Sequence, residues 1–535
     1  MPNNWFVDAS YLYAESDLEN KGRNFLSISR LRDVLDGSTP GLAGQYYNPF
    51  RDNSIYRDAT NTALINSAKV PIFEQGRSSL AIWSLKAGGE LFSLPGGAMT
   101  LGLGLEYRDD KIIHRADIYS ESNDVTAFAT ASSNGQRWVR SGYYELAVPI
   151  LGDEWSFLGA RLFEMVVAQR YDEYSSFGSA AKPKFSFRYK PLDDFTIRGS
   201  YSEGFRAPSI AELFSGQTEI FQRGLIDPKV GPLRYTPVIS GSDPNLKPEL
   251  AYSYYLGGVW TPGSKDSAHS SLGFLNGLNV YVDYYNVEKR NNIASVDPQF
   301  ILNHESLFPG AVVRNTGGAV QAINNTFQNI GRLETEGFDF GVTYSTKEFV
   351  WGKVDFEFNA NYIQRYVIQN LPDQPFIVKA GTYTLPVYKH SAQVFYSKTL
   401  FGMDTFSTGV TWNYIDSEQD QLPKPGGKVH MIGNWNTFDY QIAYNFGKAE
   451  ELMPETPLPG YAKEGRKLLG EKAVSPHRDR GSSGWRRYLA NARLVFGVNN
   501  VFDAAPPFAD EMAGYDTRTT NPLGRNFYVE FEKKF

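Results

Sequence analysis

The sequence predicts an all-β protein whose strands form one large antiparallel transmembrane barrel. Apolar and polar residues alternate strictly over segments of about nine to twelve residues, the length that a tilted strand needs to cross a bilayer. The connections between these segments alternate between long and short, and the last residue of the chain is an aromatic one, Phe535. By contrast, no run approaches the roughly 18 consecutive apolar residues of a membrane-spanning helix.

The alternation is complete in the segments 98–108 and 353–362. In the first segment one face carries only apolar and aromatic residues, namely Met99, Leu101, Leu103, Leu105 and Tyr107. The opposite face of the second segment is polar throughout, with Asp355, Glu357, Asn359 and Asn361. A period of two residues sorts side chains onto the two faces of a strand, whereas a helix would mix them.

Sixteen strands follow from this pattern. We place them at 4–15, 76–93, 98–114, 139–151, 154–170, 182–190, 194–204, 249–261, 277–288, 332–346, 351–366, 388–399, 404–415, 436–446, 488–499 and 524–535.

The lengths of the connections favour a membrane barrel over a soluble sandwich. Short turns at 94–97, 152–154, 191–194 and 400–403 alternate with long loops at 16–75, 205–248, 289–331 and 500–523. Outer-membrane barrels combine short periplasmic turns with long extracellular loops. The connection 447–487 is long and falls on the predicted periplasmic side, so either it breaks the rule or it contains a misplaced hairpin.

Tyrosines at the ends of the apolar faces fit an interfacial aromatic girdle equally as well as ordinary β-propensity. They are Tyr107, Tyr201, Tyr284, Tyr344, Tyr362 and Tyr444.

Composition excludes several classes of protein. The net charge of -6 over 535 residues gives no basic surface for nucleic acid. The chain has no cysteine, so it has neither a disulfide framework nor a thiolate metal site.

Its amino terminus, MPNNWFVDASYLYAE, lacks the pattern of a signal peptide and enters a strand-like alternation at once. We therefore expect Met1 to be a false or secondary start.

Several long segments resemble the TonB-dependent outer-membrane receptor family. The segment LDDFTIRGSYSEGFRAPSIAELF, residues 192–214, is similar to a barrel strand of that family followed by its GFRAPS-x-x-ELF loop opening. The segments 243–260 (DPNLKPELAYSYYLGGVW), 329–344 (NIGRLETEGFDFGVTY) and 496–508 (FGVNNVFDAAPPF) resemble further motifs of the family in the same order. The last strand resembles the signal read by outer-membrane assembly machinery, carried here by Phe527, Val529, Phe531 and Phe535.

This resemblance implies a place in the bacterial outer membrane and energy-coupled uptake of a scarce solute, which could be an iron chelate, a vitamin or a glycan. The implied partners are outer-membrane lipid, the assembly machinery, the TonB energy-coupling complex in an intact parent, and a small-molecule or oligosaccharide ligand.

The family has a signal peptide, a periplasmic coupling box, a plug domain and a barrel of 22 strands. The first three are not recognisable here, so residues 1–535 are expected to be a partial barrel domain with about 16 strands. An open sheet edge in lipid is costly. Either a partner chain supplies the remaining strands, a smaller barrel closes, or the chain is an amino-terminally truncated fragment.

No catalytic constellation stands out, and we predict no enzyme activity, no cofactor and no metal site. The six histidines, at 114, 269, 304, 390, 430 and 477, are scattered without metal-ligand spacing. Asp339, Asp355 and Glu357 are better explained as the polar lining of a hydrated barrel than as acid/base groups.

The recognisable motif is expected to shape the strand-to-loop transition rather than to bind ligand, since proline fixes its own φ and biases the preceding residue toward extended geometry. Its residues are Gly204, Phe205, Arg206, Ala207, Pro208, Glu212 and Leu213. A short helix is predicted at 27–37, with Leu31, Val34 and Leu35 on one face.

Ligand contacts are predicted in the long loops, where aromatic faces and polar partners suit amphipathic solutes. The candidates are Tyr46, Tyr47, Phe221, Arg223, Tyr235 and Asn325, for each of which plain loop packing is at least as good an explanation. Two other functions stay open: a plugless passive pore, which bilayer conductance would reveal, and a soluble β-rich carbohydrate-binding protein, which would extract without detergent.

Overall fold

The computed structural model describes residues 4–534 with the exception of 51–58, 127–130, 153–154, 158, 234, 264–274, 372–373, 402–403, 422–427, 448–485 and 512.

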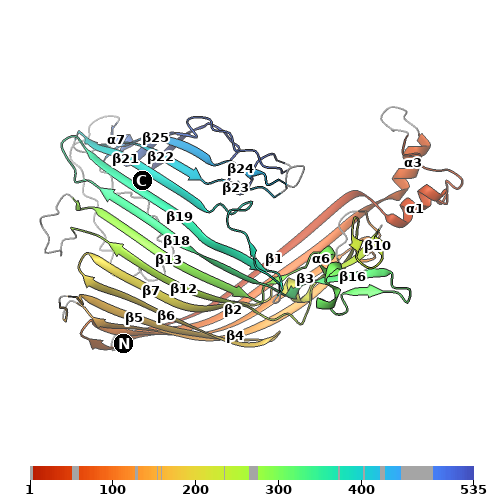
Figure 1. Ribbon diagram of the computed structural model, residues 1–535, viewed down its shortest axis with the longest axis horizontal. Coiled ribbons are helices and arrows are strands. Elements are labelled where there is room, and N and C mark those ends of the chain that lie inside the picture. Colours follow the sequence, from red (N-terminus) through yellow and green to blue (C-terminus); the bar gives the residue numbers. More distant parts are fainter. Residues whose placement is uncertain are drawn as a thin grey trace.

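One antiparallel sheet dominates the molecule and runs in long, tilted strands along its length (Figure 1). Each of the sixteen predicted strands overlaps one of its long strands, so this prediction is confirmed. They are β1 (Phe6–Leu26), β2 (Lys69–Leu94), β3 (Gly97–Ala116), β4 (Ser133–Leu151), β5 (Leu162–Tyr174), β6 (Gly178–Leu192), β7 (Phe195–Arg206), β12 (Glu249–Trp260), β13 (Leu278–Arg290), β18 (Arg332–Ser345), β19 (Lys353–Gln369), β21 (Tyr388–Leu400), β22 (Asp404–Ile415), β25 (Trp435–Asn445), β26 (Ala492–Asn499) and β27 (Asn526–Lys533).

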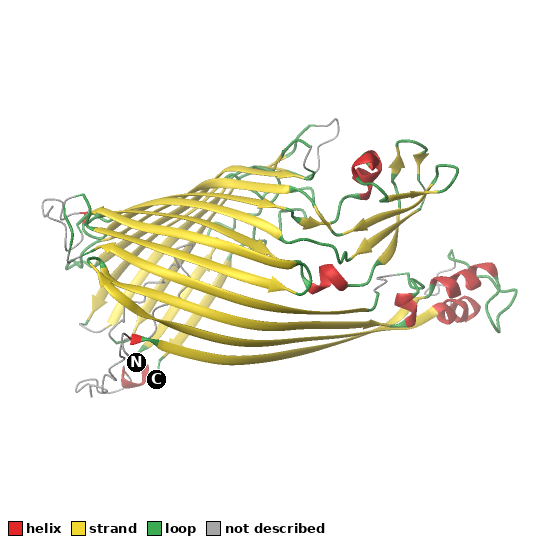
Figure 2. Ribbon diagram, turned by 90° about the horizontal axis from the view of Figure 1, so that it is seen from below, coloured by secondary structure: helices red, strands yellow, loops and turns green. Residues whose placement is uncertain are grey.

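Every long strand pairs with the next long strand along the chain, which makes the sheet a simple antiparallel meander. The sheet curls across its width (Figures 1 and 2). Its edges are β1, which pairs with β2, and β27, which pairs with β26. Among the described residues these two edge strands do not pair with each other.

The two faces of the sheet differ in chemistry, as the alternation predicts. On the polar face Arg198 of β7 donates to Asp283 of β13 at 2.7 Å, and the Tyr255 hydroxyl of β12 donates to the same carboxylate at 2.7 Å. On the apolar face large side chains stay open to the surroundings, with Leu105 61% and Leu256 54% exposed.

The buried apolar clusters of the described chain do not lie under this apolar face, because both are built from loops and the short elements within them. A soluble sandwich would cover the apolar face with a second sheet. The uncovered face instead fits contact with lipid.

The first hairpin extends well beyond the predicted strands. The predicted loop 16–75 is wrong at both ends, because β1 continues to Leu26 and β2 begins at Lys69. The extension is held by pairs such as Asp17 with Arg77, at 2.7 Å. Beyond residue 15 most of β1 is exposed on both faces, and this part of its sequence has no regular alternation of apolar and polar residues that would have marked the strand.

Other predicted boundaries are also wrong, since β4 begins at Ser133 rather than at 139 and β6 begins at Gly178 rather than at 182. The strand expected from 154 begins only at Leu162, since isolated bridges at Gly152–Trp155 and Phe157–Ala160 make a wider turn. The strand expected from 488 begins at Ala492, after the short helix α7 (Arg486–Leu489). Most of the connection 447–487 lies outside the described residues.

The predicted helix at 27–37 is confirmed as α1 (Ile28–Asp36). Ser27 caps its amino end by accepting from the Arg30 N–H, and Gly37 ends it with a φ of 73°. Val34 is fully buried against α3 (Ala59–Ala68) and its neighbours, and Leu31 packs on the same cluster. Leu35 follows Leu31 by four residues, on the same side of the helix, but it is 50% exposed.

The long loops contain regular elements that the sequence did not predict. They are α4 (Ile118–Glu121), α5 (Ile210–Phe214), β8 (Thr218–Gln222), β9 (Ile226–Asp227), β10 (Gly231–Pro232), β11 (Thr236–Gly241), β14 (Ile293–Ala294), α6 (Pro298–Asn303), η3 (Glu305–Leu307), β15 (Val312–Arg314), β16 (Val320–Thr326), β17 (Gln328–Asn329), β20 (Ile377–Val378), β23 (Glu418–Gln419) and β24 (Met431–Ile432). None of the helices in the described part of the chain has the length and apolar content to traverse a bilayer.

Candidate ligand-binding loops

The motif that ends β7 fastens the sheet to the loop that follows it. The Arg206 guanidinium donates to both oxygens of Glu249, at 2.9 and 2.8 Å, and to both oxygens of Glu212, at 2.9 and 3.1 Å. Glu249 is the first residue of β12 and is 4% exposed. Bidentate pairs between arginine and carboxylate fix the relative orientation of the two side chains in addition to balancing their charges.

Helix α5 begins directly after this pair. Ser209 and Glu212 form a reciprocal capping box, in which each side chain accepts from the other's backbone N–H. Leu213 is 1% exposed, and the carbonyl of the buried Pro208 accepts from Arg137 at 2.6 Å. Burial alone would raise the pKa of Glu212, but the hydrogen bonds from Arg206 and Ser209 outweigh burial and lower that pKa.

The remaining motif residues also pack within the strand-to-loop connection. The Phe205 ring meets the Tyr174 ring edge-on at 5.8 Å, Gly204 lies against Ala251, and Ala207 is half-buried. These contacts favour a structural role for the motif, in which it connects β7 to the loop that follows.

The loops 207–248 and 291–331 fold together into one unit, which we call the loop module. Its sheet has the order β15-β16-β11-β8, and β11 of the first loop runs parallel to β16 of the second. A cluster of buried apolar side chains lies within it: Leu225, Val238, Val296, Ile301, Leu302, Phe308, Ala311, Val312 and Ile323, with Leu371 from the next loop. This core makes the module a preformed surface rather than a pair of independent loops.

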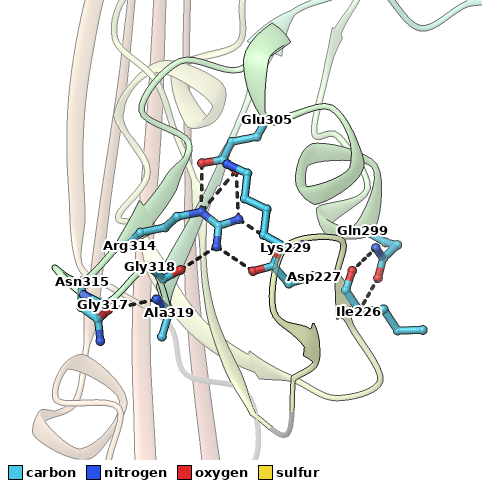
Figure 3. A network of polar contacts seen from close by, with 10 residues as sticks. All are labelled: Ile226, Asp227, Lys229, Gln299, Glu305, Arg314, Asn315, Gly317, Gly318 and Ala319. Atoms are coloured by element: carbon cyan, nitrogen blue, oxygen red, sulfur yellow. Dashed lines mark hydrogen bonds and ion pairs between the residues drawn. The ribbon is translucent and has the colours of Figure 1, made fainter.

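An ion-pair network centred on Arg314 lies inside the loop module (Figure 3). Arg314 donates to both oxygens of Asp227, at 2.6 and 3.0 Å, to Glu305 at 2.9 Å and to the Gly318 carbonyl at 2.9 Å. Lys229 adds a contact to Glu305 at 2.6 Å. The Asp227 side chain is fully buried, and its hydrogen bonds with Arg314 lower its pKa despite that burial.

Three of the predicted ligand residues are exposed at the neighbouring ends of β8 and β11 in this module. Phe221 and Tyr235 are 56% and 57% exposed, and the Arg223 guanidinium lies 4.6 Å from the centre of the Tyr235 ring. Among the described residues Arg223 forms no ion pair. We call Phe221, Arg223 and Tyr235 the Arg223 patch. It offers aromatic faces beside an unneutralised cation.

The other three predicted residues lie elsewhere. Tyr47 packs on the cluster between α1 and α3, and Tyr46 lies over Gly37 while staying 64% exposed. Asn325 is within the loop module but is 8% exposed, and its side-chain oxygen accepts from the Val296 N–H at 3.0 Å. These positions favour packing roles for Tyr47 and Asn325.

The described histidines do not gather into a metal site, and no group of three or more metal-ligating side chains does so in the described ranges. His430 pairs with Asp420 at 2.7 Å, whereas His390 is surrounded by aromatic rings, including Trp412 at 4.4 Å. His477 lies outside the described residues.

Of the residues in the expected assembly signal, Phe527, Val529 and Phe531 are 61%, 70% and 59% exposed on one face of β27. Phe535 lies outside the described residues.

Glu249, Asp227 and Arg314 are not among the residues predicted from the sequence. Glu249 was within reach, because it closes the segment DPNLKPE that resembles a family motif. Asp227 and Arg314 come from different loops and become partners only once the module has folded.

Comparisons with known proteins agree with this architecture. The family described as "TonB dependent receptor-like, beta-barrel" matches residues 2–454. The siderophore receptor PirA from Acinetobacter baumannii is 14% identical with a TM-score of 0.54, and the match covers 98% of this chain and 59% of that one. A ferric enterobactin receptor mutant (PfeA) from Pseudomonas aeruginosa, solved in complex with enterobactin, gives the same identity and coverage with a TM-score of 0.55.

A further structure, FpvA of P. aeruginosa bound to heterologous pyoverdines, is 11% identical with a TM-score of 0.50 and covers 99% of this chain and 54% of that one. At these identities the likeness shows the fold alone. The chain spans 59% of the length of the first two receptors. The comparison with curated protein sequences gave no match.

Proposed function

The chain belongs to the TonB-dependent receptor family, and from this membership we propose that it forms the outer-membrane wall and the ligand-binding outer loops of a receptor for an iron chelate. In this proposal the apolar face of the sheet contacts lipid, β27 carries the signal for the assembly machinery, and the complete receptor takes its energy from the TonB complex. The uncovered apolar face supports placement in a membrane and speaks against a soluble carbohydrate-binding protein.

The observation that carries the proposed ligand class is the Arg223 patch. Arg223 has no ion-pair partner among the described residues and lies beside the exposed Tyr235 ring, two residues along the chain from the exposed Phe221, which suits an anionic, aromatic ligand better than a neutral one. Ferric chelates with phenolate or catecholate arms combine negative charge and aromatic rings. The resemblance to receptors solved with enterobactin and pyoverdines supports the same class. A glycan would use the rings but would leave the cation without a partner.

Binding to whole cells tests this proposal. Gram-negative cells that export the chain to the outer membrane would be incubated with radio-iron in catecholate, hydroxamate or carboxylate chelates. We expect saturable retention of the catecholate chelate above cells without the chain, removed by excess unlabelled chelate, and weaker retention of the hydroxamate and carboxylate chelates. No retention of any ferric chelate would contradict the proposal.

The same cells separate the receptor from a passive pore. A pore would admit unrelated small solutes without saturation, and the purified chain would conduct ions across a planar bilayer. A receptor barrel would show saturable retention that is specific for the ligand.

A further inference from the structure

Three loops next to the loop module are tied to one another by polar contacts. They connect β19 to β21, β22 to β25, and β26 to β27, and we call them the three-loop cluster. The Gln419 N–H donates to the Gly381 carbonyl at 2.7 Å, and the Asp510 N–H donates to Asp420 at 2.6 Å. The Tyr383 hydroxyl donates to Glu511. Each loop is therefore bound to at least one of the others.

Two carboxyl groups from different loops are buried inside this cluster. Glu418 is 2% exposed and Asp516 is 0% exposed. Asp516 accepts from the Arg518 N–H at 2.9 Å and from the Thr519 hydroxyl at 2.6 Å. By contrast, Oε2 of Glu418 is buried without a hydrogen-bond partner in the described structure. A buried charge without a partner is costly, and a second carboxylate beside it increases that cost.

The backbone next to Glu418 is also under strain. Thr384, whose N–H faces Glu418, has a φ of 70°, in the left-handed region that β-branched residues avoid. Such a conformation persists only where its surroundings stabilise it. The contact with Glu418 joins the loop that carries Thr384 to the loop that carries Glu418.

Burial and the Asp516 carboxyl raise the pKa of Glu418 to about 8, although the backbone of Thr384 and Leu385 acts in the opposite direction. Other charged or titratable groups of the cluster have partners of their own. Asp420 pairs with His430, Glu511 accepts from Tyr383, and Arg518 lies near Tyr383. Among the described groups that act on Glu418, Asp516 is the charged one.

We propose that Glu418 and Asp516 share one proton, which holds the three-loop cluster closed, and that loss of this proton opens the cluster. A proton on one carboxyl of the pair lets it donate to the other carboxylate and removes the repulsion between them. The site would make the loops at this end of the barrel respond to external pH, independently of which solute the receptor binds.

The direction of the effect follows from linkage. Closing the cluster raises the pKa of Glu418 above its ordinary value of 4.5, so the closed form binds the proton more tightly than the open form. The stabilisation is complete below pH 4.5 and is lost as the pH rises through about 8. The ratio of open to closed loops should therefore increase about 100-fold between pH 6 and pH 9.

Hydrogen exchange on the chain refolded in detergent tests this proposal. We would compare wild type with Glu418→Gln at the same pH, because the intrinsic pH dependence of amide exchange then cancels. For peptides of the three-loop cluster, the exchange rate of wild type divided by that of Glu418→Gln should rise about 100-fold from pH 6 to pH 9. Glu511→Gln is the matched control, a carboxyl in the same cluster that does not contact Glu418, and it should keep the wild-type pH dependence.

Three results would overturn the proposal. The exchange ratio could be constant with pH, or Glu511→Gln could abolish the pH dependence as fully as Glu418→Gln. Alternatively, calcium at pH 9 could slow wild-type exchange to the rate of Glu418→Gln, which would make the pair a cation site. If Glu418→Gln does not refold, judged by heat-modifiable mobility, Asp516→Asn replaces it and should weaken the pH dependence by removing the like charge.

Discussion

The loop module and the three-loop cluster lie at the same end of the sheet and bury acidic side chains to a similar extent, but they balance that charge in opposite ways. Asp227 of the module is buried against the guanidinium of Arg314. Glu418 of the cluster is buried beside another carboxyl, that of Asp516. The pKa of Asp227 is lowered, whereas that of Glu418 is raised to about 8.

This difference shows that the partner, and not burial alone, decides how a buried acid responds to pH. An opposite charge keeps a carboxylate ionised across the physiological range. A like charge makes one of the two acids retain its proton. We expect the loop module to be a constant binding surface and the three-loop cluster to be the part that varies.

The largest expected effect is removal of the cation from the loop module. Arg314→Met would leave Asp227 buried without its partner and should destabilise the module by about 3–5 kcal/mol, the usual cost of breaking a buried pair. Hydrogen exchange of peptides from β8, β11 and β16 would report the loss. Peptides from β18 and β19 should keep their protection.

Arg223→Met serves as the matched control, since this arginine is exposed and has no ion-pair partner among the described residues. Equal exchange in the two variants would show that the Arg314 network does not hold the module.

A pH series sharpens the comparison further. The pKa of Asp227 and that of Glu305 are both lowered, so their contribution to stability is present above their ordinary values and is lost only in more acidic solution. The pKa of Glu418 is raised, so its contribution to stability is present in acidic solution and is lost as the pH rises.

Limited proteolysis of one sample between pH 6 and pH 9 should therefore show faster cleavage in the three-loop cluster and an unchanged rate in the loop module. When cleavage is slow relative to reclosing, its rate follows the open population. Parallel changes in the two regions would contradict the distinction.

A smaller effect is expected at the junction between the sheet and the loop module. Ser209→Ala removes the cap of α5 and should cost about 1 kcal/mol. Faster exchange of the α5 amides, without a change in β7, would be the signature. Ser209→Thr retains the hydroxyl and should remain close to wild type.

The smallest effect on stability is expected at the Arg223 patch. Phe221→Ala and Tyr235→Ala change exposed side chains, so the free energy of unfolding of the module should change by less than about 0.5 kcal/mol, measured by hydrogen exchange of peptides from β11 and β16. A larger loss would mean that the patch supports the fold, which would weaken its assignment as a ligand surface.

Local periodicity was enough to predict the sheet, because each long strand sorts its side chains onto two chemically different faces. It failed in β1 beyond residue 15, where both faces are exposed and the sequence carries no contrast. Elements such as β9 and β23 have two residues each, too few to show a period.

Among the candidate sites, too, those formed within one loop could be predicted from the sequence and those formed between loops could not. Phe221, Arg223 and Tyr235 could be proposed from residue type because they lie close together in one loop. The pairs Asp227–Arg314 and Glu418–Asp516 each join different loops. Their opposite charge balance depends on tertiary contacts, which a single sequence does not reveal.

The most direct test of the receptor proposal is a binding titration with the purified, refolded chain. Ferric catecholate, hydroxamate and carboxylate chelates would be added while tryptophan fluorescence is followed, for wild type and for the Arg223→Met, Phe221→Ala and Tyr235→Ala variants. We predict saturable binding of the catecholate chelate, with affinity reduced at least 10-fold in each patch variant while the loop module stays folded. Binding of none of the ferric chelates by the folded chain would contradict the proposed function.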